Sequence, residues 1–141
     1  MKITHILASL AATAMVSAAP AFAEMQSYKA VLNAAAQVPA NDSKGTGALT
    51  ASYDTATKKL TYSVTYAGLS GPPTAAHFHG PADAKSNAGV ALGAKDVAAS
   101  PIKGEATLTD AQAADLMAGK WYFNIHTEKN KGGEIRGQVM K

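Results

Sequence analysis

Three histidines in the sequence have a spacing that suits a metal site. His77 and His79 are separated only by Phe78, and His126 follows later in the chain. Side chains two residues apart on a β-strand point to the same side, so the first two imidazoles can converge on one ion, and a third from a neighbouring strand can complete the set. Imidazole nitrogen binds copper, zinc, nickel and iron. The same spacing also suits the polar edge of an ordinary strand, so the direction of the three rings matters.

Side-chain alternation predicts that direction. Between residues 121 and 126 the large apolar side chains occupy every second position, and this face is predicted to be the core face. His126 and Asn124 then point away from the core. By the same test Phe78 points inward, and His77 and His79 point outward. The three histidines of residues 24–141 are therefore all predicted on outward-facing positions, on two strands that can lie side by side.

Other polar residues are candidates for the same site. Asn124 and Arg136 are expected to flank His126 on the outer face, where the amide can orient an imidazole and the guanidinium can attract an anion. Glu134 is placed with them as a neighbouring group, and Glu134 and Asp83 are possible oxygen ligands. The alternative for each is a cross-strand hydrogen bond or a surface ion pair such as Arg136–Glu134, which contributes little stability.

The rest of the chain predicts an all-β protein, a sandwich or a barrel of antiparallel strands with one short helix. Short strands alternate with breaks rich in Gly, Pro, Asn and Asp, which is typical of that class. Strands are expected at 28–37, 45–54, 59–68, 74–79, 102–109, 120–127 and 133–140. The segment 81–100 is predicted to be a long loop with one short strand, and loops of that length commonly cover a site.

The helix is predicted from its capping signals. Thr109 and Gln112 form a capping-box pattern, residues 111–118 are good helix formers, and Gly119 is a natural stop. Its large apolar residues are Leu116 and Met117, so it is expected to close one end of the barrel.

The beginning of the chain predicts export. Residues 1–23 have a basic start, a short apolar stretch and a small-residue end at Ala23, the arrangement of a signal peptide cut before Glu24. The mature domain is then 24–141, in the periplasm or outside the cell, with no membrane span after cleavage. It has no cysteine, so it has no disulfides. Its basic residues are scattered, which argues against a nucleic-acid partner.

Two motifs carry a family resemblance. "AAHFHGPA" (75–82), followed by "WYFNIHTEKNKGGEIRGQV" (121–139), resembles the CHRD (chordin-type) domain of secreted bacterial proteins across essentially the whole mature chain. The resemblance implies an immunoglobulin-like β-barrel distantly similar to copper–zinc superoxide dismutase. His77, His79 and His126 then look like copper ligands of that enzyme, and Arg136 like its anion-steering arginine.

The residue count limits what this resemblance implies about function. The mature chain has no fourth histidine to bridge two metals and no second ligand cluster. The sequence therefore favours an exported, non-catalytic binding domain with a candidate three-histidine metal site, for which copper is preferred to zinc. The alternatives are a copper-dependent redox enzyme, and a structural domain without metal that binds another protein or a small molecule.

Overall fold

The computed structural model describes residues 22–141, and the predicted signal peptide lies almost entirely outside them. The described chain is all-β with one short helix, as predicted. In chain order its elements are β1 (Met25–Asn33), a 3-10 turn (Ala34–Ala36), β2 (Thr46–Asp54), β3 (Lys59–Ala67), β4 (Pro73–His79), β5 (Val90–Gly93), β6 (Ile102–Thr107), α1 (Asp110–Met117), β7 (Tyr122–Thr127) and β8 (Ile135–Gln138).

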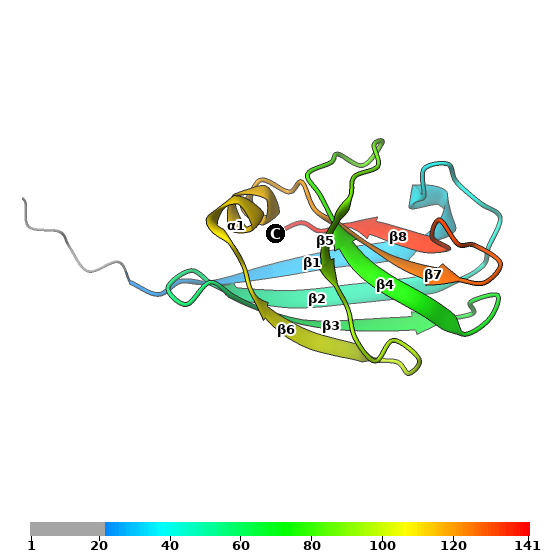
Figure 1. Cartoon of the computed structure of the whole chain (residues 1–141), viewed down its shortest axis with the longest axis horizontal. Helices are drawn as coiled ribbons and strands as arrows, with labels where there is room; N and C mark the ends of the chain where they lie inside the picture. The colour runs from blue at the N-terminus through cyan, green and yellow to red at the C-terminus, as the bar shows by residue number, and fades with distance from the viewer. Residues whose placement is uncertain (1–21) are drawn as a thin grey trace, which may run out of the picture.

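The eight strands form one antiparallel sheet in the order β5-β4-β7-β8-β1-β2-β3-β6. The sheet curls so that β4 and β7 lie across from β2 and β3, as Figure 1 shows. The pairing of β2 with β3 runs without a break from Thr46↔Ala67 to Asp54↔Lys59, so the two strands form a hairpin. The strands that carry the histidines, β4 and β7, are immediate neighbours.

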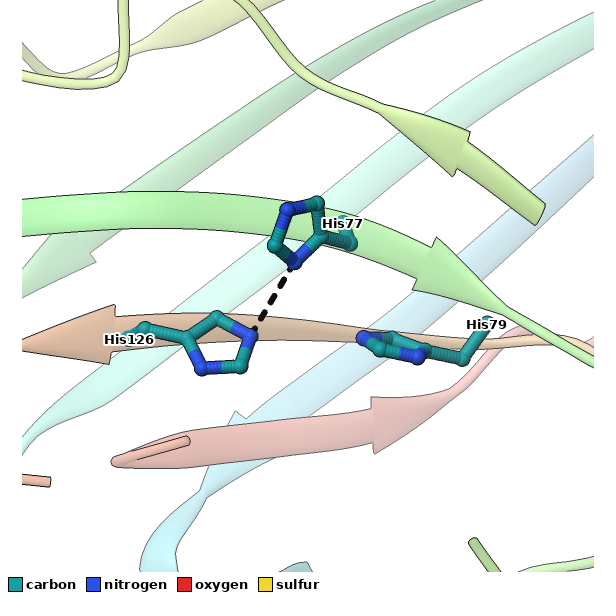
Figure 2. Close-up of side chains that lie close together, drawn as sticks. All are labelled: His77, His79 and His126. Atoms are coloured by element: carbon teal, nitrogen blue, oxygen red, sulfur yellow. Dashed lines mark hydrogen bonds between the residues drawn. The ribbon is translucent and has the colours of Figure 1, made fainter. Parts of the chain in front are cut away.

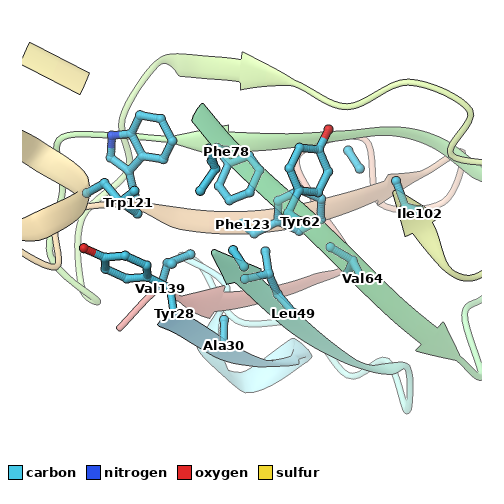
Figure 3. Packing of buried hydrophobic residues seen from close by; sticks show 14 of the residues in the cluster. Tyr28, Ala30, Leu49, Tyr62, Val64, Phe78, Ile102, Trp121, Phe123 and Val139 are labelled. Carbon is cyan, nitrogen blue, oxygen red and sulfur yellow. The ribbon is translucent and has the colours of Figure 1, made fainter. Parts of the chain in front are cut away.

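Aromatic side chains fill the space inside the curl (Figure 3). Phe78 of β4 lies at the centre, with its ring centroid 5.0 Å from Tyr62, 4.8 Å from Phe123 and 5.5 Å from Trp121. Phe78, Phe123 and Trp121 are fully buried. Edge-on and tilted contacts of this kind add to the free energy that burial alone contributes. The core therefore holds β4 and β7 in place from their inner side, as the alternation of residues 121–125 predicts.

Some predicted boundaries were wrong because of local capping. The first strand was expected to reach residue 37, but it ends at Asn33, whose side-chain oxygen accepts a hydrogen bond from the Ala36 amide and starts the 3-10 turn. The strand expected at 102–109 ends at Thr107, because Thr109 is the helix N-cap and forms the predicted capping box with Gln112. In the helix, Leu116 is buried and Met117 is exposed.

Candidate metal centre

The antiparallel pairing of β4 with β7 brings the histidines together on the outer face of the sheet. His77 lies opposite Asn124 and His79 opposite Tyr122, while His126 pairs with Ala75 and is therefore diagonal to His77. Cross-strand and diagonal neighbours on one face are close enough for their side chains to touch. Figure 2 shows the three rings on the same side of the two strands, turned toward a common point.

The ring nitrogens are within the range of a single ion. One nitrogen from each of His77, His79 and His126 lies within 4.8 Å of the other two. His77 Nδ1 is 3.1 Å from His126 Nε2, the hydrogen bond drawn in Figure 2. The ring centroids of His77 and His126 are 5.0 Å apart, and those of His77 and His79 are 5.5 Å apart. The cluster can therefore hold a metal.

Backbone carbonyls set the tautomers of two rings. His79 Nδ1 is 3.0 Å from the carbonyl oxygen of Ala88, and His126 Nδ1 is 2.8 Å from that of Lys131. A carbonyl oxygen only accepts hydrogen bonds, so each Nδ1 carries a proton and donates it. In the neutral ring the lone pair then lies on Nε2. This pattern is characteristic of metal-binding histidines, whose other ring nitrogen donates to a carbonyl or carboxylate.

Asn124 joins the two rings. Its side-chain oxygen lies 2.9 Å from His79 Nε2 and 2.9 Å from His126 Nε2. Asn124 is buried, so the contact is shielded from water. The structure thus brings this predicted neighbour into direct contact with both imidazoles.

Burial and mutual repulsion favour the neutral form of His77 and His126. Desolvation lowers the pKa of His77, and the nearby rings of His126 and His79 lower it further. Desolvation also lowers the pKa of His126, opposed by its hydrogen bond to the Lys131 carbonyl and reinforced by the nearby His79. Metal ligation needs the unprotonated imidazole, so these pKa shifts favour binding at neutral pH.

The outer face is less exposed than simple alternation implies, because the segment between β4 and β5 folds over it. His79 is only 8% exposed. Its ring stacks on Tyr122, with centroids 4.8 Å apart, and the Tyr122 hydroxyl accepts a hydrogen bond from the Ala88 amide. The long loop therefore covers one side of the histidine cluster, as its length suggested.

Arg136 holds this loop. Its guanidinium donates to the Asn87 side chain at 2.9 Å and to the backbone carbonyls of Asp83 and Ser86 at 3.0 and 2.8 Å. The guanidinium carbon also lies 3.4 Å from the centroid of the Tyr122 ring. Arg136 is 1% exposed. The three N–H groups in these bonds serve the loop, not the anion-attracting role that the sequence predicts for Arg136.

Glu134 lies away from the imidazoles, contrary to its predicted place on the outer face. Its carboxylate accepts hydrogen bonds from the hydroxyls of Ser43, Ser70 and Thr127 at 2.5–2.7 Å. Burial would raise the pKa of Glu134, but these hydrogen bonds, with one from the Ser70 amide, lower it to about 2. Alternation failed here because Glu134 precedes β8, which begins at Ile135. Glu134 therefore links the chain before β8 to the segments around Ser43 and Ser70.

Asp83 is also engaged locally. Its side chain accepts hydrogen bonds from the Lys85 amide at 2.8 Å and the Ser86 hydroxyl at 2.9 Å. These bonds shape the turn of the covering loop, and the carboxylate makes no contact with the histidines among the described residues.

Sequence reasoning missed three contributors to the site. Tyr122 was not among the candidate residues, although alternation places it on the same face as Asn124 and His126. The carbonyls of Ala88 and Lys131 carry no sequence signal, because any residue supplies one. Only the folded loops bring them to the rings.

Comparison with protein families decides what kind of domain carries this cluster. Residues 28–139 match the CHRD domain, a range that includes every residue of the candidate metal centre. The chain belongs to the CHRD domain family. Comparisons with curated proteins and with solved structures found no match.

This CHRD domain is thus a small β-domain with a histidine cluster on the outer face of its curled sheet. Within residues 22–141, none of the helical structure has the length and apolar character needed to cross a bilayer.

Proposed function

We propose that this CHRD domain binds one transition-metal ion through His77, His79 and His126, with copper as the preferred metal. The observation that carries the proposal is the pair of carbonyl-bound Nδ1 atoms, at 3.0 Å in His79 and 2.8 Å in His126. These bonds present Nε2 of both rings as lone-pair donors in a cluster already within 4.8 Å. Copper binds imidazole more strongly than other divalent ions of its row.

We also propose that the domain binds or buffers the metal rather than turning over a substrate. A dismutase-like enzyme would use a free arginine to attract its anionic substrate to copper. The guanidinium of Arg136 instead donates to Asn87, Asp83 and Ser86 and is 1% exposed. Export through residues 1–23 would place the domain in the periplasm or outside the cell, where it meets external copper.

The test is a metal titration of untagged protein. We expect one copper ion per chain, measured by calorimetry and by elemental analysis after dialysis. A variant with all three histidines changed to alanine should bind none, and the exposed-site control Glu105→Gln should bind as the wild type does. Wild-type protein without stoichiometric copper or zinc would instead support a structural or protein-binding domain. Superoxide turnover by the copper-loaded protein would support the redox alternative.

A further inference from the structure

We propose that the side-chain oxygen of Asn124 is a fourth ligand of the same ion, so that the site offers three imidazole nitrogens and one amide oxygen to a divalent cation, Cu(II) in preference to Cu(I). This inference rests on the proposed metal-binding function and adds to it a ligand and an oxidation state.

The first step is to account for the protons around Asn124. Nδ1 of His79 and Nδ1 of His126 each donate to a backbone carbonyl, so Nε2 of each neutral ring has a lone pair and no proton. The Asn124 oxygen lies 2.9 Å from both Nε2 atoms, and it too carries only lone pairs. Three acceptors therefore meet with no hydrogen between them.

A cation resolves this arrangement. The lone pairs of Asn124 and His79 face each other with no proton between them, and the His126 lone pair faces Asn124 while it also accepts from His77. A metal ion placed among them would accept electron density from all three. Asn124 is buried, so water does little to relieve the repulsion. The fourth atom is His77 Nδ1, 3.1 Å from His126 Nε2. Without metal it donates its proton to that lone pair. With metal, the His77 proton moves to Nε2.

The separations of these atoms indicate the geometry. Two ligands about 2.0–2.1 Å from one ion lie roughly 2.9 Å apart when their bonds are perpendicular and roughly 3.4 Å apart at the tetrahedral angle. The chain of contacts from His77 through His126 and Asn124 to His79 measures 3.1, 2.9 and 2.9 Å. These values match perpendicular bonds. Tetragonal sites of nitrogen and oxygen ligands are typical of Cu(II) and Ni(II), rather than of tetrahedral zinc.

The fold holds the Asn124 amide in this position. Asn124 lies directly between Arg136 of β8 and His77 of β4 in the strand register. Gly133 has φ 121°, and a Cβ atom there would lie 2.7 Å from Asn124 Nδ2. The missing side chain of Gly133 leaves room for the amide nitrogen on that side, while the oxygen faces the imidazoles.

The ligand types select the oxidation state. An amide oxygen is a hard ligand, whereas Cu(I) prefers thiolate and thioether sulfur. The chain has no cysteine. A set of three nitrogens and one oxygen therefore favours Cu(II), and reduction should weaken binding.

The decisive experiment compares Asn124→Asp with Asn124→Ala. Aspartate keeps the oxygen and the shape of the side chain but loses the amide N–H groups. If the oxygen is a ligand, Asn124→Asp should bind Cu(II) at least as tightly as the wild type, and Asn124→Ala about 10–100-fold more weakly. If Asn124 only donates hydrogen bonds from its nitrogen, both variants should lose affinity equally, and the inference would be overturned. Thermal unfolding and His79→Ala serve as controls for folding and for the site.

A second measurement does not depend on the folding of any variant. Wild-type protein labelled with ¹³C only in asparagine and loaded with Cu(II) should show a ¹³C hyperfine coupling in pulsed electron paramagnetic resonance, and Asn124→Asp should lose it. Copper bound by the wild type without that coupling would overturn the oxygen ligand and leave the proposed function standing. Wild-type protein that binds no copper would overturn both.

Discussion

Hydrogen bonds at two ring nitrogens distinguish this cluster from histidines that merely line a polar strand. A solvent-facing imidazole is free to take either tautomer. Here the Ala88 and Lys131 carbonyls fix Nδ1 of His79 and His126 as donors. This directs both Nε2 atoms to the same place. Within residues 22–141 no backbone carbonyl bonds to the His77 ring, and its Nδ1 instead faces His126.

Removal of the His79 ring or of the His126 ring should weaken Cu(II) binding to the same extent. We expect His79→Ala and His126→Ala each to weaken Cu(II) binding by about 100-fold or more, because each removes a ligand whose orientation is already set. Calorimetric titration of the two variants at pH 7.5 checks this. Wild-type affinity in His126→Ala would remove that residue from the site.

Glu134, which lies between β7 and β8, stabilises the fold and is not part of the histidine cluster. Three hydroxyls and the Ser70 amide bond its buried carboxylate and link the residues before β8 to the loops around Ser43 and Ser70. Hydrogen bonds to a charged acceptor are stronger than those between neutral groups. The low pKa of Glu134 is therefore a contribution to stability.

This contribution should depend on pH. The pKa of Glu134 is about 2 in the fold, below its ordinary value of 4.5, so its stabilisation is complete above about pH 4.5 and is lost as the pH falls toward 2. We expect Glu134→Gln to lower the free energy of unfolding by about 2–3 kcal/mol at pH 7, and by much less near pH 2.5. Urea unfolding at both pH values measures the difference. The exposed Glu105→Gln should change stability by under about 1 kcal/mol at either.

The loop between β4 and β5 is the element on which the site most depends. It supplies the Ala88 carbonyl to His79, and Arg136 of β8 holds it through Asp83, Ser86 and Asn87. The planar guanidinium reaches all three partners and also stacks on Tyr122. Arg136 therefore positions the loop that contacts His79 of the candidate metal centre.

Arg136→Lys should show whether the loop needs the planar guanidinium or only a positive charge at this position. Lysine keeps the positive charge but has no planar fork and stacks poorly, so we expect the loop to loosen and Cu(II) affinity to fall about 10-fold. Hydrogen exchange should show faster exchange of amides in residues 82–89, with the amides of β2 and β3 unchanged. Unchanged exchange in that loop would contradict the positioning role.

The complete domain has no disulfide to hold its curled sheet, since cysteine is absent from the chain. Its core is apolar and continuous, and the histidine cluster lies outside that core between β4, β7 and the covering loop. Metal that binds only the folded state stabilises it by mass action. Copper should therefore add to the stability of the folded domain.

Copper should raise the melting temperature of the wild type. Free Cu(II) at 100 times its Kd stabilises the fold by about 2.7 kcal/mol, or roughly 10 °C for a domain of this size. The variant with all three histidines changed to alanine should show no shift. Scanning calorimetry with and without Cu(II) tests both, and an equal shift in the variant would place the copper elsewhere.

Proton competition should appear only at acidic pH. The pKa values of His77 and His126 are lowered by burial, so each ring takes up a proton at a lower pH than an ordinary histidine, whose pKa is about 6.5. We expect Cu(II) affinity to be nearly constant from pH 8 to 6.5 and to fall below it. Calorimetry across this range, corrected for buffer protonation, gives the profile. A steep fall already above pH 7 would contradict the lowered pKa values.

Much of the fold and the outline of the site can be predicted from the sequence, because alternation along a strand is a local property. Trp121, Phe123 and Phe78 were assigned to the core, and His77, His79 and His126 to the opposite face, from the two-residue period alone. The period is geometric and holds wherever the strand is paired. It failed at Glu134 because that residue precedes its strand.

Tertiary structure alone decided how those side chains meet. The register of β4 against β7 places His77 opposite Asn124, and no local pattern encodes a register between strands so far apart in the chain. The carbonyls of Ala88 and Lys131 reach the rings only after the loops close. The burial of Arg136 likewise depends on the loop folding over the sheet. Local periodicity sets the direction of a side chain, whereas its partners depend on long-range packing.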